Sequence, residues 1–371
     1  MKRSLTLALL LLITLSMGWS QGWKRTFGGQ TAFDCQKVLQ TNDDGYFLVG
    51  SREVGSGISE SVHIVRLDLD GNELWSQTYQ QGWEDKAFDA LLTADGGLFI
   101  AGQTRERPTS YINAFLLKIN PFGETQWFKT YGDELDNNAV SITAAENTLA
   151  LAGYATNAET EARNFYLIKT DLEGELIFDK QLGGLDEEEA RDIIAVEDGY
   201  LLAGYIEYVS SSKQRDMYVV KVDENGELRW SRALGGFEYE DAKAIAQTSD
   251  GNFIVAGNKG VTEDFCAFSL NADGVEQWER QYELDFEQVC TDVFSNEDGT
   301  IILGGSTIDE DGINIDLAIL KVSAEGNLIW SRQYGDEEWK DEASSIIATS
   351  DGGYAIAGSS DLLNVSNNSI N

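Results

Sequence analysis

Short apolar runs separated by glycine-containing turns fill most of this chain. Within residues 226–278, runs rich in β-branched and aromatic residues occur at 228–234, 242–248, 253–257 and 265–270. Asp250-Gly251 and Asp273-Gly274 interrupt them and favour tight hairpin turns, because these residue types tolerate positive φ angles. Such runs predict four short strands, and no helical period persists along the chain.

The four-strand pattern recurs throughout the sequence, and a tryptophan marks each copy. Phe178 takes the place of the tryptophan in one copy, and successive markers are 48 to 52 residues apart. The tryptophans are Trp23, Trp75, Trp127, Trp230, Trp278 and Trp330. Self-similarity at this period indicates one supersecondary unit copied seven times, which is typical of a β-propeller.

We therefore predict an all-β fold, a seven-bladed β-propeller of four-stranded repeats of about 52 residues. The alanine-containing strand of each repeat is expected innermost and the tryptophan strand outermost. The ring is expected to close when the N-terminal strand, 23–27, becomes the outer strand of the last blade. The third strand is found only six times, so the last blade is expected to be incomplete, by design or by truncation.

The first 20 residues are typical of a secretory leader. Lys2 and Arg3 precede an apolar run over 5–15, and the small residues Gly18 and Ser20 suit a cleavage site after residue 20. We predict a signal peptide at 1–20 and a single propeller domain at 21–371. The protein is expected to be secreted, at an extracellular or periplasmic location, without membrane insertion.

The acidic composition narrows the classes of partner. The formal net charge is −36, which disfavours nucleic acid and anionic membranes and favours cations or cationic partners. We expect a monomer. Cys35 and Cys290 align with alanines of other repeats and are expected to be small buried residues, whereas a reactive thiol or a disulfide remains the alternative for Cys266.

Two segments carry a resemblance to a known group of proteins. GGLFIAG…NAFLLKINPFGETQW (96–127) and GNFIVAG…DFCAFSLNADGVEQW (251–278) resemble the repeats of secreted β-propeller proteins common in Bacteroidetes. The strand plan is also similar to that of the quinoprotein, or PQQ-like, propeller superfamily. The resemblance implies the propeller fold and specifies no activity.

The loops between the outer strand of one repeat and the inner strand of the next combine acids with an aromatic residue. Aromatic rings beside carboxylates suit a sugar, and convergent carboxylates suit a bound Ca²⁺ cofactor. The alternative is that the acids hydrogen-bond to strand ends and the aromatics pack between blades. The candidate ligand-binding residues are Trp83, Glu84, Asp85, Tyr239, Glu240, Asp241, Phe286 and Trp339, and the candidate metal ligands are Asp85, Glu189 and Asp241.

Several enzyme signatures are missing. His63 is the only histidine, which argues against a histidine metal cluster and against Ser-His-Asp or Cys-His catalysis. No catalytic residue is assigned. We expect an exported, non-catalytic binding or scaffold propeller whose ligand, a polysaccharide or an extracellular protein, binds the loop face. The alternatives are a carbohydrate-active hydrolase or lyase that uses carboxylates at the channel mouth, and a purely structural cell-surface protein.

Overall fold

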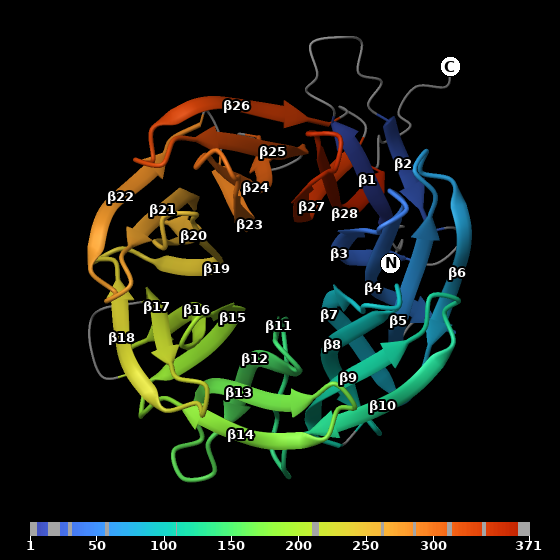
Figure 1. Cartoon of the computed structure of the whole chain (residues 1–371), viewed down its shortest axis with the longest axis horizontal. Coiled ribbons are helices and arrows are strands. Elements are labelled where there is room, and N and C mark those ends of the chain that lie inside the picture. Colours follow the sequence, from blue (N-terminus) through green and yellow to red (C-terminus); the bar gives the residue numbers. More distant parts are fainter. Residues whose placement is uncertain are drawn as a thin grey trace, which may run out of the picture.

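A computed structural model shows that the chain is built from β-strands arranged in a ring (Figure 1). Every regular element within the described residues is a strand. The same residues contain no helix with the length and apolar character that a membrane crossing requires. The structure describes residues 6–13, 23–28, 32–55, 59–108, 110–209, 215–260, 263–284, 287–309, 314–335 and 339–362.

Five sheets contain four antiparallel strands each, and each sheet takes its strands from one stretch of sequence. The first two sheets are β3 (Phe33–Gln40), β4 (Tyr46–Val54), β5 (Ser59–Leu67), β6 (Glu73–Tyr79), and β7 (Glu84–Leu92), β8 (Leu98–Arg105), β9 (Ile112–Ile119), β10 (Thr125–Tyr131). The next three are β11 (Ser141–Ala145), β12 (Thr148–Thr156), β13 (Arg163–Asp171), β14 (Leu176–Leu182), then β15 (Glu187–Val196), β16 (Gly199–Glu207), β17 (Arg215–Val222), β18 (Leu228–Leu234), and β19 (Glu240–Gln247), β20 (Phe253–Lys259), β21 (Asp264–Leu270), β22 (Glu276–Tyr282).

The prediction of seven separate blades is wrong, because the described strands form six sheets. The sixth sheet has eight strands. A single parallel pairing, between Ile315 and Lys340, joins its two halves, so that the last two repeats share one sheet. Its strands are β23 (Glu287–Ser295), β24 (Ile301–Ile308), β25 (Ile315–Val322), β26 (Leu328–Tyr334), β27 (Trp339–Ala348), β28 (Tyr354–Leu362), β1 (Thr6–Ile13) and β2 (Trp23–Phe27).

The N-terminal strands complete this eight-stranded sheet. β2 is its outer strand, at the place expected for 23–27, but it reaches β28 only through β1, which lies between them. Residues 6–13 of the predicted leader therefore occupy the third-strand position, which we expected either to be missing or to be lost by truncation. Removal of the leader remains a prediction.

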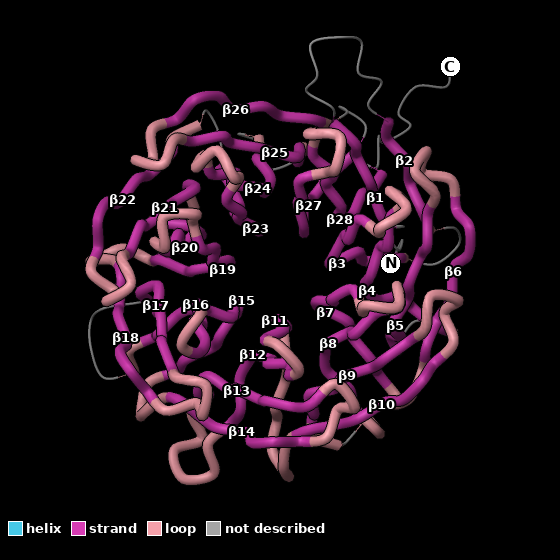
Figure 2. Tube along the Cα trace, viewed as in Figure 1, coloured by secondary structure: helices cyan, strands magenta, loops and turns pink. Residues whose placement is uncertain are grey.

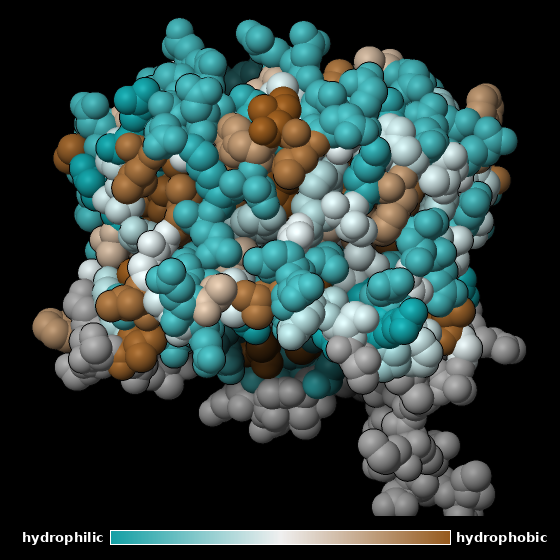
Figure 3. All heavy atoms as spheres, turned by 90° about the horizontal axis from the view of Figure 1, so that it is seen from below, coloured by the Kyte–Doolittle hydropathy of each residue, from teal (hydrophilic) through white to brown (hydrophobic). Residues whose placement is uncertain are grey.

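The sheets stand in a ring around a central axis, with their first strands innermost (Figures 1 and 2). The inner strands are β3, β7, β11, β15, β19, β23 and β27, and the strands that carry the repeat aromatics lie at the rim. Seen from the side, the surface is mainly hydrophilic, with scattered hydrophobic residues (Figure 3). This arrangement brings the same repeat position of each inner strand to the channel wall.

Apolar cores lie between neighbouring sheets, and the repeat tryptophans extend them to the rim. Trp75 packs beside the cluster that contains Phe47, Ile64 and Phe115. Its ring also lies over Gly123, a turn glycine of the next sheet with a φ of 82°. The hydroxyl of Tyr79 donates to the carbonyl of the same glycine at 2.7 Å. The spacing W-x-x-x-Y thus reflects contacts of one outer strand with the next sheet's turn.

Candidate binding site in the central channel

The predicted carboxylates of the loop face are largely engaged within the fold. Asp85 is fully buried and accepts hydrogen bonds from the backbone N–H of Gln81 at 2.7 Å and of Gly82 at 3.0 Å. It also accepts the hydroxyl of Thr104 at 2.5 Å. Glu240, at the equivalent position, is fully buried and accepts the N–H of Gly236 at 3.2 Å. These two acids hold loops onto inner strands, as the structural alternative predicted.

Trp83 and Glu84 lie apart from any shared site. The Trp83 side chain is 38% exposed, and its backbone N–H donates to the carbonyl of Arg105 at 2.6 Å. Glu84 forms ion pairs with Lys86 at 3.4 Å and Arg105 at 3.8 Å. Trp83 therefore offers a partly exposed ring, but Glu84 beside it is paired with cations and Asp85 is bonded to the backbone and to Thr104.

The candidate metal ligands Glu189 and Asp241 are paired with cations as well. Glu189 contacts the guanidinium groups of Arg163 and Arg191, and Asp241 contacts Lys243 at 2.7 Å. Among the described residues, no group of three or more His, Cys, Asp or Glu side chains could hold a metal ion. The calcium prediction therefore has no ligand cluster in this part of the chain.

Of the other candidate aromatic residues, Tyr239 is described by the structure and is covered by a cation. The guanidinium of Arg215 lies 4.9 Å from the ring centre of Tyr239 and 3.6 Å from that of Tyr205, so it already covers both rings. Phe286 lies outside the described residues. Trp339 begins β27, and its side chain lies outside the described part of the structure.

A cavity of about 460 Å³ opens into the channel instead, and it was not predicted from the sequence. Pairs of consecutive residues line it, from the inner strands or, for Val140, from the position just before β11, together with Asn138, Val289, Cys290 and Ala343. The consecutive pairs are Gln36-Lys37, Phe88-Asp89, Val140-Ser141, Arg191-Asp192, Lys243-Ala244, Thr291-Asp292 and Ser344-Ser345. The volume falls within the range of small-molecule sites, roughly 300–1,000 Å³.

A repeated backbone irregularity explains why two consecutive side chains face the channel. The pairing register shifts at the same repeat position in most of the inner strands, for example between Ala87 and Asp89 in β7 and between Ala190 and Asp192 in β15. Such a shift leaves one extra residue unpaired and turns its side chain out of the normal alternation. Phe88 and Arg191 are the extra residues in these two strands, and both line the cavity.

Three aspartates in the cavity wall bind the backbone of the following inner strand. Asp89 accepts the N–H of Ile142 at 3.0 Å, and Asp192 accepts that of Ile245 at 2.8 Å. Asp292 accepts the backbone N–H of Ile346 at 3.0 Å. These carboxylates fasten neighbouring inner strands to one another around the channel.

Lys37 supplies the positive charge that balances these acids. Its ammonium group lies 3.2 Å from Oδ1 of Asp89. The negative charge of Asp89, and beyond it those of Asp292 and Asp192, holds the pKa of Lys37 above its ordinary value. Burial raises the pKa of Asp192 to about 6 and raises that of Asp292 in the same direction.

Hydroxyl groups complete the cavity wall. The Ser141 hydroxyl lies 3.1 Å from Asp89 and 2.8 Å from Asp192, so it bridges two carboxylates. The Ser345 side chain is 1% exposed, and its hydroxyl has no hydrogen-bond partner within the described residues. A buried hydroxyl without a hydrogen-bond partner destabilises the folded state. Ser345 is therefore open to a hydrogen bond with a ligand or water.

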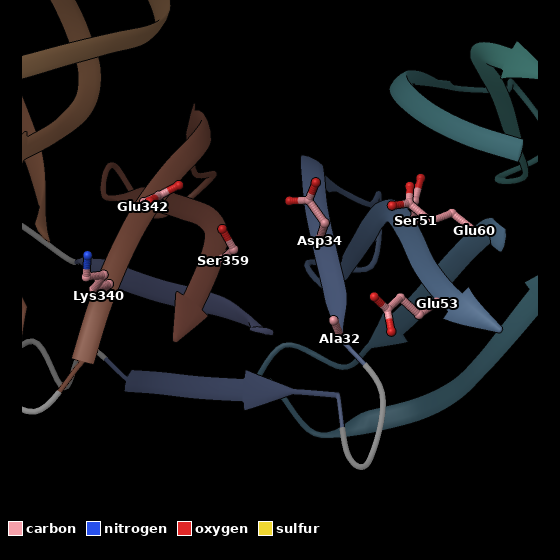
Figure 4. A pocket seen from close by; sticks show the side chains of 8 residues that line it. All are labelled: Ala32, Asp34, Ser51, Glu53, Glu60, Lys340, Glu342 and Ser359. Carbon is pink, nitrogen blue, oxygen red and sulfur yellow. The ribbon is translucent and has the colours of Figure 1, made fainter. Parts of the chain in front are cut away.

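A second cavity, of about 330 Å³, lies where β27 and β28 meet β3, β4 and β5 (Figure 4). Lys340, Glu342 and Ser359 line one side, and Asp34 and Glu53 are among the residues opposite. It lacks an aromatic side chain and consists mainly of acids and serines. We therefore take the channel cavity as the candidate site.

Comparison with known proteins supports the fold only. No protein-family model matches the chain, and a search of curated protein sequences also found no match. Among solved structures, the Neurospora crassa Pan2 WD40 domain aligns with a TM-score of 0.56 and 8% identity, over 87% of this chain and 88% of that one. Hydrazine synthase from Kuenenia stuttgartiensis gives 0.53 and 13%, over 86% and 90%.

A third similar structure is a putative 6-phosphogluconolactonase from Bacteroides fragilis, with a TM-score of 0.52, 13% identity, and coverage of 85% of this chain and 87% of that chain. The three neighbours agree with a β-propeller built from repeats. At this identity they carry no information on ligand or activity. The resemblance to Bacteroidetes repeat proteins and to quinoproteins remains a prediction.

Proposed function

We propose that this β-propeller is a non-catalytic binding scaffold whose channel cavity takes a carbohydrate. The observation that carries the proposal is the wall of the cavity, where Phe88 stands beside carboxylates, cations and hydroxyls. An aromatic face can stack on the apolar face of a sugar, while Asp192, Lys243 and Ser345 offer hydrogen bonds to its hydroxyl groups. The proposed site is therefore the channel cavity, whereas the sequence predicted the loop aromatics.

The test is a panel of insoluble polysaccharides incubated with the protein, with retention on the polymer and release of reducing ends scored together. The proposal expects retention without release. Phe88→Ala is expected to weaken retention at least tenfold, about 1.4 kcal/mol. Trp83→Ala is the matched control, because this aromatic residue is partly exposed and lies outside the cavity. Equal loss in both variants would contradict the assignment to the channel.

A carbohydrate-active hydrolase or lyase is the second candidate. One observation favours it: Asp192 has a pKa of about 6, and Ser141 joins it to Asp89. A carboxyl group with such a pKa suits general acid–base work. Release of reducing ends that is lost in Asp192→Asn would favour this candidate over simple binding.

A protein ligand on the loop face is the remaining alternative for a scaffold. Leu185 is 77% exposed and Phe237 is 92% exposed, both in loops that lead into inner strands. Large exposed apolar side chains occur at protein interfaces. Failure of every polysaccharide in the panel would move the proposal to this class. We also propose that the protein is monomeric and is exported to an extracellular or periplasmic location. If it binds neither a polysaccharide nor a protein, a purely structural role at the cell surface is the remaining alternative.

A further inference from the structure

Smaller residues occupy both repeat positions of one outer strand. β14 has Phe178 in place of the repeat tryptophan, and Leu182 four residues later, where four other repeats have tyrosine. These tyrosines are Tyr79, Tyr131, Tyr282 and Tyr334. In the first three, the hydroxyl donates to a turn carbonyl of the next sheet at 2.7 to 3.0 Å. Leucine has no hydroxyl and a shorter side chain, so β14 cannot make this contact.

A cavity of about 290 Å³ lies at this place, between two neighbouring sheets of the ring (Figure 1). Leu182 of β14 lines one side of it. The opposite side is lined by Tyr218, Val220 and Leu228 of β17 and β18. A tyrosine at position 182 would extend over the next sheet, as Tyr79 does in its own repeat. We therefore attribute the cavity to the departure of β14 from the repeat.

Two buried oxygen atoms lie beside this cavity. Glu188 lines it and is 3% exposed, and Oε2 of Glu188 accepts the backbone N–H of Gly184 only at 3.5 Å. Asn164 is also 3% exposed, and its Oδ1 has no hydrogen-bond partner within the described residues. Both oxygens lie 2.6 Å from the point that a Cβ on Gly183, another lining residue, would occupy. One donor group at this point could therefore reach both oxygens.

The charge of Glu188 determines which donor is suited to this position. Burial raises the pKa of Glu188 to about 7, because its carboxylate loses solvation, and the acids nearby act in the same direction. The adjacent Glu189 is paired with Arg163 and Arg191, whereas no cation of the described residues acts on Glu188. A cationic donor would supply the missing partner, and the net charge of −36 attracts cations to the protein.

We propose that this cavity binds a primary ammonium group carried on an apolar stem. The ammonium group has three donors, so it can bind Oε2 of Glu188 and Oδ1 of Asn164 together. Its stem would lie against Leu182, Val220 and the ring of Tyr218. A free alkylamine and a lysine side chain of a partner protein both have this chemistry. The site is separate from the channel cavity, so the proposal does not depend on the carbohydrate ligand.

The test is a calorimetric titration of the full chain at pH 8, where both the amine and the carboxylate are charged. The probes are butylamine and Nα-acetyl-lysine amide. Both are expected to bind if the site takes lysine side chains, and butylamine alone if it takes free amines. Butyltrimethylammonium has the same charge without an N–H donor, and we expect it to bind at least tenfold more weakly. Binding of neither amine would overturn the proposal.

A substitution of the buried acid tests the site without changing its shape. Glu188→Gln is expected to weaken amine binding at least tenfold, because it removes the charge. The fold should tolerate this change, since Gln288 is buried at the equivalent position of another repeat. Glu240→Gln is the matched control, because it alters the equivalent buried acid of the next sheet and lies outside the cavity. Equal binding by the two variants would contradict the assignment.

A second variant restores the repeat. Leu182→Tyr is expected to fill the cavity and to abolish amine binding, while the melting temperature is maintained or raised by the added contact with the next sheet. Circular dichroism verifies the fold before the titration. Binding to folded Leu182→Tyr as tight as to the unsubstituted protein would overturn the proposal.

Discussion

The ammonium nitrogen of Lys37, on β3, lies 3.2 Å from Oδ1 of Asp89, on β7. Asp89 also binds the backbone of Ile142 on the next inner strand, so the pair links consecutive members of the ring. The same two side chains line the channel cavity. The residues that join the inner strands therefore also create the polar surface offered to a ligand.

Loss of Lys37 should destabilise the fold. Lys37→Met removes the cation that balances Asp89, and we expect a loss of about 2 kcal/mol, between the values for exposed and buried pairs. Urea unfolding measures the change. Lys129→Met is the control, because Lys129 pairs with the exposed Glu175, and the loss there should stay below about 1 kcal/mol. Equal losses in the two variants would argue against a special role for Lys37.

Asp192 should make stability depend on pH. Its folded-state pKa of about 6 is above the ordinary 3.8, so between these values the folded state binds the proton more tightly than the unfolded state. Its contribution is therefore fully present below about pH 4 and declines as pH rises through 6, by up to about 3 kcal/mol in all. Unfolding curves from pH 4.5 to 8 should show this decline, and Asp192→Asn should flatten it. Parallel pH profiles for the two proteins would contradict the assignment.

The contact between a repeat tryptophan and a turn glycine should be sensitive to one added carbon. In Gly326→Ala, the new Cβ would lie 2.9 Å from the ring of Trp278, at a φ of 77°. In Gly299→Ala, with a φ of 79°, no atom lies within 4 Å of the new Cβ. The control should lose about 1 kcal/mol from the backbone alone, and Gly326→Ala should lose about 1–3 kcal/mol more. Thermal unfolding that ranks them in reverse would refute the packing account.

The cysteines should be inert in the native protein. Cys35, Cys266 and Cys290 are free and fully buried, and burial raises the pKa of each thiol above its ordinary value. Iodoacetamide at pH 8 should label none of them in buffer and all three in guanidinium chloride. Rapid labelling of Cys266 in the native state would restore the reactive-thiol alternative.

Features that recur in each sequence repeat could be predicted, whereas features that occur only once could not. Apolar runs, turn glycines and the repeat aromatic residues report contacts that occur in almost every sheet, so they predicted strands, turns and the propeller class. The number of sheets depends on one pairing, Ile315 with Lys340, which leaves no periodic signal. The position of residues 6–13 was also missed, because a leader and a buried third strand have the same apolar composition.

Residues that recur in every repeat predicted the fold correctly but were a poor guide to the candidate site. Asp85 and Glu240 were chosen because acids recur in the loops, yet recurrence reflected their shared role in holding loops to strands. The channel residues differ from repeat to repeat, as with Lys37 and Asp89. In the sequence, these polar residues lie two positions after the repeat alanine or cysteine. Only the register shift in the structure shows that two consecutive side chains face the channel.

The most direct test of the central claim is retention on the polysaccharide to which the protein binds best, compared between Phe88→Ala and Trp83→Ala. If the channel cavity is the binding site, Phe88→Ala loses at least tenfold in affinity while Trp83→Ala retains the affinity of the unsubstituted protein. The opposite ranking, with both variants folded, would place the ligand on the loop face and contradict the channel assignment.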